Sequence, residues 1–389
     1  MKVVIVGGGA IGSSAAYHLA THPGFRGEIV VVERDPTYAR ASSMLSASGI
    51  RLQFSTPVSI RMSQYGLRFL RAAREALAVD GDAPELAFKE HGYLFLATEA
   101  GMPVLRENVA VQRAEGADIT LLDPAGLADR FPWIATEDLA AGAFGERGEG
   151  SFDGPALLQA LRRKARSLGV RYVAQEATGF RRDGARVTGV LLADGAVLEC
   201  DEAVITAGAW SGRVASWLDL DLPIVPRKRM VYVLACRDKL PRCPLVIDPT
   251  GIWFRAEGER FLAGRSPGEG EPDPDEPPLV VEDEMFTDYV WPVLAARVPA
   301  FEQIKVVSSW AGYYELNLFD HNGVVGRHPA VPNAVFAAGF SGHGMQHSPA
   351  AGRGVAELIT DGRFTSLDLG PLGWERLLAG QPMWERNIV

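Results

Sequence analysis

The segment 2-KVVIVGGGAIGSSAAYHLA-20 decides the fold of this chain. Its first five residues are almost wholly apolar and predict a buried strand, and the residues after Gly12 predict a helix. Between them, Gly7, Gly9 and Gly12 have the spacing G-x-G-x-x-G. A second apolar run, 29–32, ends at Glu33, which follows Gly12 by 21 positions. This order of strand, glycine loop, helix, strand and acid is typical of a βαβ dinucleotide site.

Each position of this motif has a physical reason. Gly7 makes the tight turn, Gly9 lets the main chain approach a pyrophosphate, and Gly12 lets the helix pack on the strand. The helix N-terminus offers N–H groups and a partial positive charge. Glu33 can accept hydrogen bonds from a ribose, although the adjacent Arg34 weakens its repulsion of a 2′-phosphate. A tight turn without a ligand is the alternative, and the motif does not separate FAD from NAD.

A second glycine-rich segment, 339-GFSGHGMQHSPAAGRGVAELI-359, lies close to the end of the chain. It follows the apolar run 334–338, which predicts a buried strand. Gly339, Gly342 and Gly344 then lead into a predicted helix. A loop of this kind brings main-chain N–H groups close to a negative or electron-rich group.

The bulk composition excludes several classes of protein. A chain of 389 residues favours two domains, and 47% hydrophobic with 22% charged residues is ordinary for a soluble globular protein. The net charge of −9 argues against a nucleic-acid partner. No apolar run is long enough to span a bilayer, and three glycines interrupt the apolar N-terminus, so we interpret that segment as structure and expect a cytoplasmic protein.

Cysteine and histidine spacing predicts neither disulfides nor a metal site. Cys200, Cys236 and Cys243 are odd in number and contain no C-x-x-C pair, which fits a reducing compartment. His343 and His347 are spaced as H-x-x-x-H, but no Glu follows His343 as a zinc protease site would need.

The rest of the chain predicts alternating helices and strands. The segments with the clearest patterns are a long amphipathic helix at 57–79, a strand at 93–97, short helices and turns at 101–131, short strands with Asp-Gly turns at 177–206, a second group of strands at 229–264, an exposed acidic loop at 266–278, a helix at 282–298 and a strand at 304–314.

Three stretches together resemble the D-amino-acid oxidase/sarcosine oxidase superfamily of FAD-dependent oxidoreductases. They are the N-terminal motif with its second strand, 204-VITAGAWSG-212, and the late glycine-rich segment. Further stretches are most similar to a mitochondrial branch of that superfamily linked to respiratory complex I assembly: 48-SGIRLQFSTP-57, 226-PRKRMVYV-233, 298-VPAFEQIKVVSSWAGYYELNLFDHNGVVG-326 and 385-ERNIV-389.

The resemblance implies an α/β fold in which two domains interleave. A Rossmann-like, glutathione-reductase-like FAD-binding domain would comprise residues 1–84, 149–222 and 325–365. An α+β substrate domain on a mixed or antiparallel sheet would comprise 85–148 and 223–324, with a C-terminal tail at 366–389.

The resemblance also implies FAD as the cofactor, because NAD has no use for the second glycine loop. That loop would face the pyrimidine end of the flavin. Ser46 and Ala311 stand where some relatives carry the histidine or cysteine that attaches the flavin, so we expect FAD to be bound without a covalent bond. The residues implied to contact FAD are Gly7, Gly9, Ala10, Ile11, Gly12, Glu33, Arg34, Ser42, Ser43, Ala177, Ala207, Gly208, Gly339, Gly342, His343, Gly344, Met345 and Gln346.

The implied reaction is oxidation of the C–N bond of a secondary or N-substituted amino acid, with hydride transfer to flavin N5. The candidate catalytic residues are Arg51, His343, Tyr313 and Gln346. Arg51 is the expected carboxylate anchor, because a guanidinium pairs with a carboxylate through two parallel hydrogen bonds; a structural arginine is the alternative. For Tyr313 and Tyr314, we expect one to face the flavin cavity and the other to pack.

Two departures from the family pattern favour a dehydrogenase over an oxidase. Gln346 replaces a lysine that holds the substrate carboxylate in sarcosine oxidases. No lysine occurs around Leu262, where oxidases carry one that promotes reaction with oxygen; Arg265 is close enough in sequence to substitute. The electron acceptor stays open.

Several neighbouring residues have plainer interpretations. Arg227, Lys228 and Arg229 form a cluster that is most often a solvated run. Trp210 is expected to pack, and His347 is a weaker functional candidate than His343. Two other functions stay open: a 2-hydroxy-acid dehydrogenase with His343 as base, and a flavoprotein that serves as assembly or electron-transfer partner of a respiratory complex. A blocked cavity would favour the latter.

Overall fold

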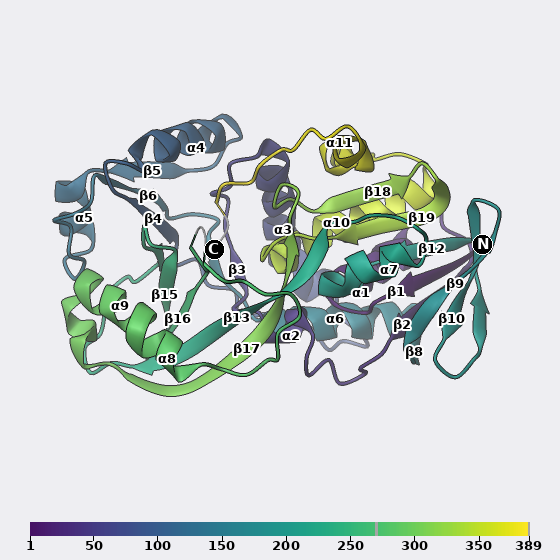
Figure 1. Cartoon of the computed structure of the whole chain (residues 1–389), viewed down its shortest axis with the longest axis horizontal. Helices are drawn as coiled ribbons and strands as arrows, with labels where there is room; N and C mark the ends of the chain where they lie inside the picture. Colours follow the sequence, from purple (N-terminus) through teal and green to yellow (C-terminus); the bar gives the residue numbers. More distant parts are fainter. Residues whose placement is uncertain (269–270, 388–389) are drawn as a thin grey trace.

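The computed structural model describes residues 1–268 and 271–387 (Figure 1). Two positions of the predicted acidic loop, 269–270, and the last two of the 385–389 stretch lie outside the described residues. At the N-terminus, β1 (Lys2–Val6), α1 (Ala10–Thr21) and β2 (Glu28–Glu33) form the predicted βαβ unit, with β1 and β2 parallel.

A six-stranded sheet extends this unit in the order β18-β19-β12-β1-β2-β8. The added strands come from distant parts of the chain: β8 (Arg171–Ala174), β12 (Glu202–Ile205), β18 (Val324–His328) and β19 (Val331–Ala338). All neighbours are parallel except β18 and β19. Strands buried on both faces need continuous apolar runs, and β1, β2, β12 and β19 have them.

Helices cover one face of this sheet, and a second small sheet covers the other. The first face carries α1, α3 (Pro57–Ala76), α6 (Gly154–Ser167) and α10 (Gly344–Thr360), whose apolar sides share one core with β1 and β2. On the other face are the antiparallel strands β9 (Ala177–Asp183), β10 (Arg186–Leu192) and β11 (Val197–Glu199), with α7 (Ser211–Ser216) and α11 (Trp374–Leu378).

An eight-stranded mixed sheet forms the other half of the molecule, in the order β17-β13-β16-β15-β14-β4-β6-β5. Only β4 and β14 pair in parallel. Figure 1 shows β13 and β17 reaching from this sheet toward the six-stranded half. The strands are β4 (Tyr93–Ala97), β5 (Ile119–Leu122), β6 (Ala141–Gly145), β13 (Ile224–Ala235), β14 (Leu245–Ile247), β15 (Ile252–Glu257), β16 (Arg260–Arg265) and β17 (Lys305–Asn317).

Shorter elements complete the fold. Around the eight-stranded sheet lie α4 (Met102–Ala114), α5 (Pro124–Arg130), α8 (Asp283–Met285), η2 (Phe286–Val290), α9 (Trp291–Arg297) and η3 (Pro299–Gln303). Nearer the six-stranded sheet lie α2 (Ser42–Leu45), β3 (Gly49–Ile50), β7 (Gly150–Ser151), η1 (Gly208–Trp210) and η4 (Gly370–Leu372).

The predicted α/β fold with a mixed second sheet is confirmed, while the domain boundaries stay a prediction. The segment 282–298 is helical as predicted, with the π-helical turn η2 in its middle. One local prediction was wrong. The segment 101–131 holds a strand, β5, besides its helices; its apolar side chains pack on β6, a contact that local sequence pattern does not reveal. In the described part of the chain, no helix is both long and apolar enough to cross a membrane.

Helices α1 and α10 cross at very short range, which places both glycine loops at the same end of the sheet. At Gly352 a Cβ would lie 2.3 Å from Ser14 Oγ and 2.5 Å from its main-chain carbon. Only a residue without a side chain allows this approach. The crossing therefore fixes how deeply α10 sits against the βαβ unit.

We predict that Gly352→Ala lowers the free energy of unfolding by about 1–3 kcal/mol, because a methyl group must push main chain apart. Gly354→Ala is the matched control on the same helix. Its Cβ would meet the end of the Leu369 side chain at 2.6 Å, which can move, so a smaller loss is expected. Urea unfolding of the two purified variants measures the difference; equal losses would contradict the role of the crossing.

Candidate functional site

A cavity of about 370 Å³ lies where the two halves of the molecule meet. The carboxyl ends of the parallel strands β1, β2, β8 and β12 all open into it, as expected for a ligand site of an open α/β sheet. Every residue predicted to contact FAD lines this cavity except Gly12 and Gly339. The structure thus brings together side chains and loops that are more than three hundred positions apart in the sequence.

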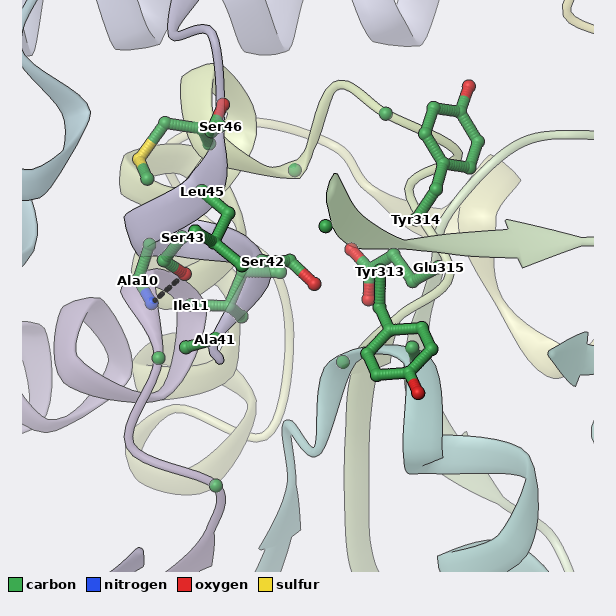
Figure 2. Close-up of a pocket in the computed structure, with 18 of the residues that line it drawn as sticks. Ala10, Ile11, Ala41, Ser42, Ser43, Leu45, Ser46, Tyr313, Tyr314 and Glu315 are labelled. Carbon is green, nitrogen blue, oxygen red and sulfur yellow. Dashed lines mark hydrogen bonds between the residues drawn. The ribbon is translucent and has the colours of Figure 1, made fainter. Parts of the chain in front are cut away.

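The first glycine loop forms one end of the cavity. Gly7 has φ +97°, and a Cβ there would lie 2.4 Å from the carbonyl oxygen of Thr206. Glu33 Oε2 accepts a 2.8 Å hydrogen bond from Gly8 N. Ser43 Oγ accepts one of 3.0 Å from Ala10 N (Figure 2). The N-cap residue Gly9 offers α1 no side-chain cap, and Ser43 takes up the N–H of Ala10 from outside the helix, so the partial positive charge of the remaining N-terminal N–H groups faces the cavity.

Gly12 and Gly339 shape the loops without lining the cavity. A Cβ at Gly12 would lie 1.9 Å from Gly7 O, so this glycine keeps loop and helix in contact. Gly339 has φ +80°, and a Cβ there would lie 2.6 Å from the Ile224 side chain. Both residues act on the position of the main chain.

The second glycine loop also lines the cavity. Ser341 and Gly342 have φ of 44° and 87°, which turns the chain sharply before α10. Tyr314 stabilises the turn, because its hydroxyl donates to the Ser341 carbonyl and its ring occupies the place of a Gly342 side chain. His343 is the N-cap of α10 and contributes no side-chain cap. A second helix N-terminus therefore faces the cavity.

The two histidines of this segment differ in role. His343 lines the cavity and is 4% exposed, and neither of its ring nitrogens has a partner among the described residues. Burial, with smaller contributions from His347 and Arg51, holds the pKa of His343 well below its ordinary value, so the ring is neutral. His347 does not line the cavity; its Nε2 is 2.9 Å from Ser63 Oγ, which is a structural contact.

Arg51 lines the cavity and is 3% exposed. Its guanidinium carbon lies 3.9 Å from the centre of the Phe54 ring, and its N–H groups donate to the carbonyls of Gln53 and Asn387. No carboxylate of the described residues forms an ion pair with it. Burial lowers the pKa of Arg51, yet an arginine stays charged at neutral pH. The cavity wall therefore carries a cation that forms no ion pair with the described residues, although the carboxylates of Glu385 and Glu149 act on it from a longer range.

Gln346 acts on the main chain of Arg51. Its Oε1 accepts a 2.8 Å hydrogen bond from Arg51 N, while the residue also lines the cavity. The contact joins the first turn of α10 to the segment after β3. It thereby fixes the position of the Arg51 main chain, from which the guanidinium side chain extends.

Both candidate tyrosines line the cavity, which corrects the prediction that one of them only packs. Tyr313 OH donates to Pro277 O at 3.1 Å, and its ring meets that of Trp210 edge-on at 5.2 Å. Trp210 also lines the cavity, with the Arg34 guanidinium 4.7 Å from its ring centre. Trp210 therefore packs, as predicted, and also lines the cavity.

The basic cluster on β13 is not a solvated run. Arg229 forms two 2.9 Å hydrogen bonds with Asp273, Arg227 pairs with Asp275, and Lys228 pairs with Glu282. The prediction failed because these acids belong to a segment some fifty positions later. Arg229 lines the cavity as a result.

Arg265 also lines the cavity, and Glu271 pairs with it. Leu262, which precedes Arg265 on the same strand, β16, does not line the cavity. Another lining residue that sequence reasoning missed is Glu315, whose carboxylate points into the cavity (Figure 2). A single acid within an apolar strand carries no motif that would have found it.

Of the two residues that replace the family's flavin-attachment residues, one lines the cavity and the other does not. Ser46 lines the cavity, and its Oγ accepts a 3.0 Å hydrogen bond from Ser48 N. Ala311 does not line it; the next residue, Gly312, does. Non-covalent binding stays a prediction.

The cavity fits FAD by its distribution of charge. Two helix N-termini, those of α1 and α10, face it, and neither has a capping side chain from its own N-cap residue. FAD has two regions that suit such ends: the pyrophosphate, and the pyrimidine edge of the flavin, which becomes negative on reduction. No group of metal-binding side chains occurs among the described residues.

Comparison with known proteins agrees with this geometry. The family described as "DAO: FAD dependent oxidoreductase" matches residues 2–358. The chain is 46% identical to FAD-dependent oxidoreductase domain-containing protein 1 of Xenopus laevis over 422 aligned positions, which cover 100% of this chain and 84% of that protein. It is 27% identical to the glycine oxidase of Geobacillus kaustophilus, covering 96% of both.

Among solved structures, L-proline dehydrogenase from P. horikoshii superposes with a TM-score of 0.86 at 25% identity, covering 98% of both chains. The matched stretch includes both glycine loops and almost every residue of the cavity. FAD is therefore the cofactor. The chain belongs to the DAO family of FAD-dependent oxidoreductases.

Proposed function

We propose that this protein oxidises the C–N bond of a secondary or N-substituted amino acid. The observation that carries the proposal is Arg51, a buried guanidinium on the wall of the cofactor cavity that forms no ion pair with the described residues. A buried charge is costly unless a partner compensates it, and a substrate carboxylate is such a partner. The name of one relative, L-proline dehydrogenase, fits a secondary amino acid, and the name of another, glycine oxidase, fits the broader class of amino acids.

Bound FAD supplies a two-electron acceptor, and the chain orients the substrate. Arg51 binds the carboxylate through its planar fork, and the ring of Phe54 keeps the guanidinium in place and dry. Gln346 holds the Arg51 main chain. The amine must be neutral to lose a hydride from its α carbon, and an apolar, enclosed site lowers the pKa of an amine in that direction.

A second candidate is oxidation of a 2-hydroxy acid, because His343 lines the cavity with both ring nitrogens available. This reaction requires a base that removes the hydroxyl proton. Burial and neighbouring cations hold the pKa of His343 well below its ordinary value, so the ring is a weak base. Amine oxidation needs no such base, and we favour it. The cavity with its converging polar groups also favours an enzyme over a pure assembly partner.

We further propose that the enzyme is a dehydrogenase in a cytoplasmic setting. No lysine occurs among the described residues that line the cavity. The nearest substitute, Arg265, is paired with Glu271, which offsets its charge. A cation that is free to face the flavin favours formation of superoxide, so the pairing of Arg265 slows reaction with oxygen, while the proposal assigns Arg51 to the substrate carboxylate.

The substrate class is tested by anaerobic bleaching of the flavin. N-methyl and cyclic secondary amino acids should bleach the bound FAD, whereas the same amines without a carboxylate should not. Hydroxy acids serve as the comparison series. Bleaching by hydroxy acids alone would instead support the second candidate.

The acceptor is tested in the oxidative half-reaction. After anaerobic reduction, the enzyme should be reoxidised slowly by air and much faster by a quinone or a dye, as followed by stopped-flow absorbance. Arg265→Lys with Glu271→Gln is the informative double variant, because it restores a lysine without its acidic partner. Peroxide formation at the full turnover rate in the wild type would contradict a dehydrogenase.

The role of Arg51 is tested by substitution. Removing one partner of a desolvated charge pair costs about 2–5 kcal/mol, so Arg51→Ala should slow the reductive half-reaction roughly 30-fold or more for an acid substrate. The rate of the reductive half-reaction in Arg51→Lys should lie between those of the wild type and Arg51→Ala, because lysine keeps the charge but loses the planar fork. Arg297→Lys, far from the cavity and paired with Asp248, is the control. Loss of FAD from Arg51→Ala would make it a structural residue.

A further inference from the structure

Glu315 is a buried carboxylate on the wall of the FAD cavity to which the proposed amine oxidation gives no role. It is 8% exposed and points into the cavity from β17 (Figure 2). A Cβ built on Gly344, the first residue of α10, would lie 2.7 Å from its Oε1, and one on Gly208 would lie 3.8 Å from its Oε2. The carboxylate thus stands between the N-terminus of α10 and η1, on the wall of the cavity.

The carboxylate has only weak partners. The N–H groups of Gly339 and Phe340 donate to it at 3.3 and 3.4 Å, which is long for a hydrogen bond to a charged oxygen. On β13 the residue opposite is Pro226, and the next side chain, Arg227, is paired with Asp275. No cation of the described residues forms an ion pair with Glu315.

The other elements around it offer no compensating charge. Tyr314, on its own strand, has a pKa that burial raises to about 12, and His343 has one that burial holds low, so both are neutral near pH 7. The Arg229 guanidinium over the Tyr314 ring is paired with Asp273. The segments η1 and α2 carry no ionisable side chain.

In this setting Glu315 can change its protonation state near neutral pH. Burial raises its pKa to about 7, while the two main-chain N–H groups act weakly in the opposite direction. A carboxyl group of this kind changes protonation in response to a small change in nearby charge. The group that changes charge in this cavity is the cofactor.

Reduction by hydride brings two electrons and one proton to bound FAD, so the site gains one negative charge. That charge develops at the pyrimidine edge, the end that the second glycine loop and α10 are expected to face. An ionised Glu315 in the same cavity would repel it, whereas a protonated one could donate a hydrogen bond. Uptake of one further proton from solvent removes the conflict.

We propose that Glu315 binds a proton when the bound FAD is reduced, so that the cavity keeps its net charge through the redox cycle. Per catalytic cycle, the substrate gives two electrons and one proton to the cofactor, and solvent gives one proton to the Glu315 carboxylate. On reoxidation both protons leave. Glu315 thereby balances the charge of the cavity. It takes no part in breaking the C–H bond of the substrate.

The pH dependence of the flavin potential tests this proposal without any substrate. For a two-electron couple, each proton taken up changes the potential by about 30 mV per pH unit. Between pH 7.5 and 9, wild-type protein titrated against redox dyes should approach the two-proton slope, and Glu315→Gln should show the one-proton slope. A wild-type slope of one proton overturns the proposal before any variant is made.

Glu149→Gln is the matched control. Burial also raises the pKa of Glu149 to about 7, but this residue lies outside the cavity and accepts from Gln53. It should keep the wild-type slope; if it loses the slope as Glu315→Gln does, a general electrostatic effect replaces the specific one. A protonated-carboxyl infrared band that appears on reduction at pH 8.5, and is missing in Glu315→Gln, would identify the group directly, and its absence in the wild type would contradict us.

Thermal stability gives a second, independent readout. Because the pKa of Glu315 is raised above its unfolded value, its ionisation destabilises the folded oxidised protein at high pH and has no effect well below the unfolded pKa. Glu315→Gln holoprotein should therefore melt higher than wild type at pH 8.5, with the difference vanishing toward pH 4.5. A constant difference across that range would mean that the residue has only a packing role. Since neither measurement uses a substrate, failure here leaves the proposed amine oxidation untouched.

Discussion

The parallel pairing of β12 between β1 and β19 is the constraint on which the site depends. It brings the carboxyl ends of three strands, separated by some two hundred and then one hundred and thirty positions, to one edge of a sheet. Each of those ends continues into a segment of the cofactor site: the first glycine loop, η1 and the second glycine loop. Because hydrophobic burial on both faces fixes the strand register, the loops meet without needing strong contacts of their own.

The same arrangement explains why both helices after the glycine loops begin without side-chain caps. A serine or aspartate at those positions would stabilise the helix by about 1 kcal/mol, but it would occupy the donors that the cofactor uses. The folded chain without FAD therefore keeps two polarised ends in one cavity. Binding of FAD completes them, and this coupling makes the cofactor part of the stability of the fold.

The first glycine loop and its helix could be predicted well from the sequence. The side chains on the cavity wall could be predicted only poorly. The βαβ unit follows from local pattern, because turn, strand and helix each have a short-range signature. The neighbours of Arg229 and the setting of Glu315 could not be predicted, since their partners are joined through strand pairing and not through sequence distance. Trp210 and Tyr314 show the same limit: an aromatic residue in a strand or turn has the same pattern whether it packs inward or lines a cavity. Arg51 was selected from a resemblance, while its lack of an ion pair with the described residues became visible only from the surrounding side chains.

The charged residues discussed on the cavity wall differ in whether they have a partner of opposite charge. Arg229 and Arg265 have acidic partners from the segment after β16, and they contribute little net charge. Arg51 and Glu315 form no ion pair with the described residues, although the carboxylates of Glu385 and Glu149 act on Arg51 from a longer range. One is a fixed cation and the other a carboxyl group whose pKa burial raises to about 7, so the charge of this part of the wall changes with the protonation of Glu315. A carboxylate substrate and a reduced flavin both add negative charge to this space. A cavity that meets the first with a permanent guanidinium and the second with a titratable acid can bind substrate at any pH near neutrality, while it adjusts its charge only when electrons arrive.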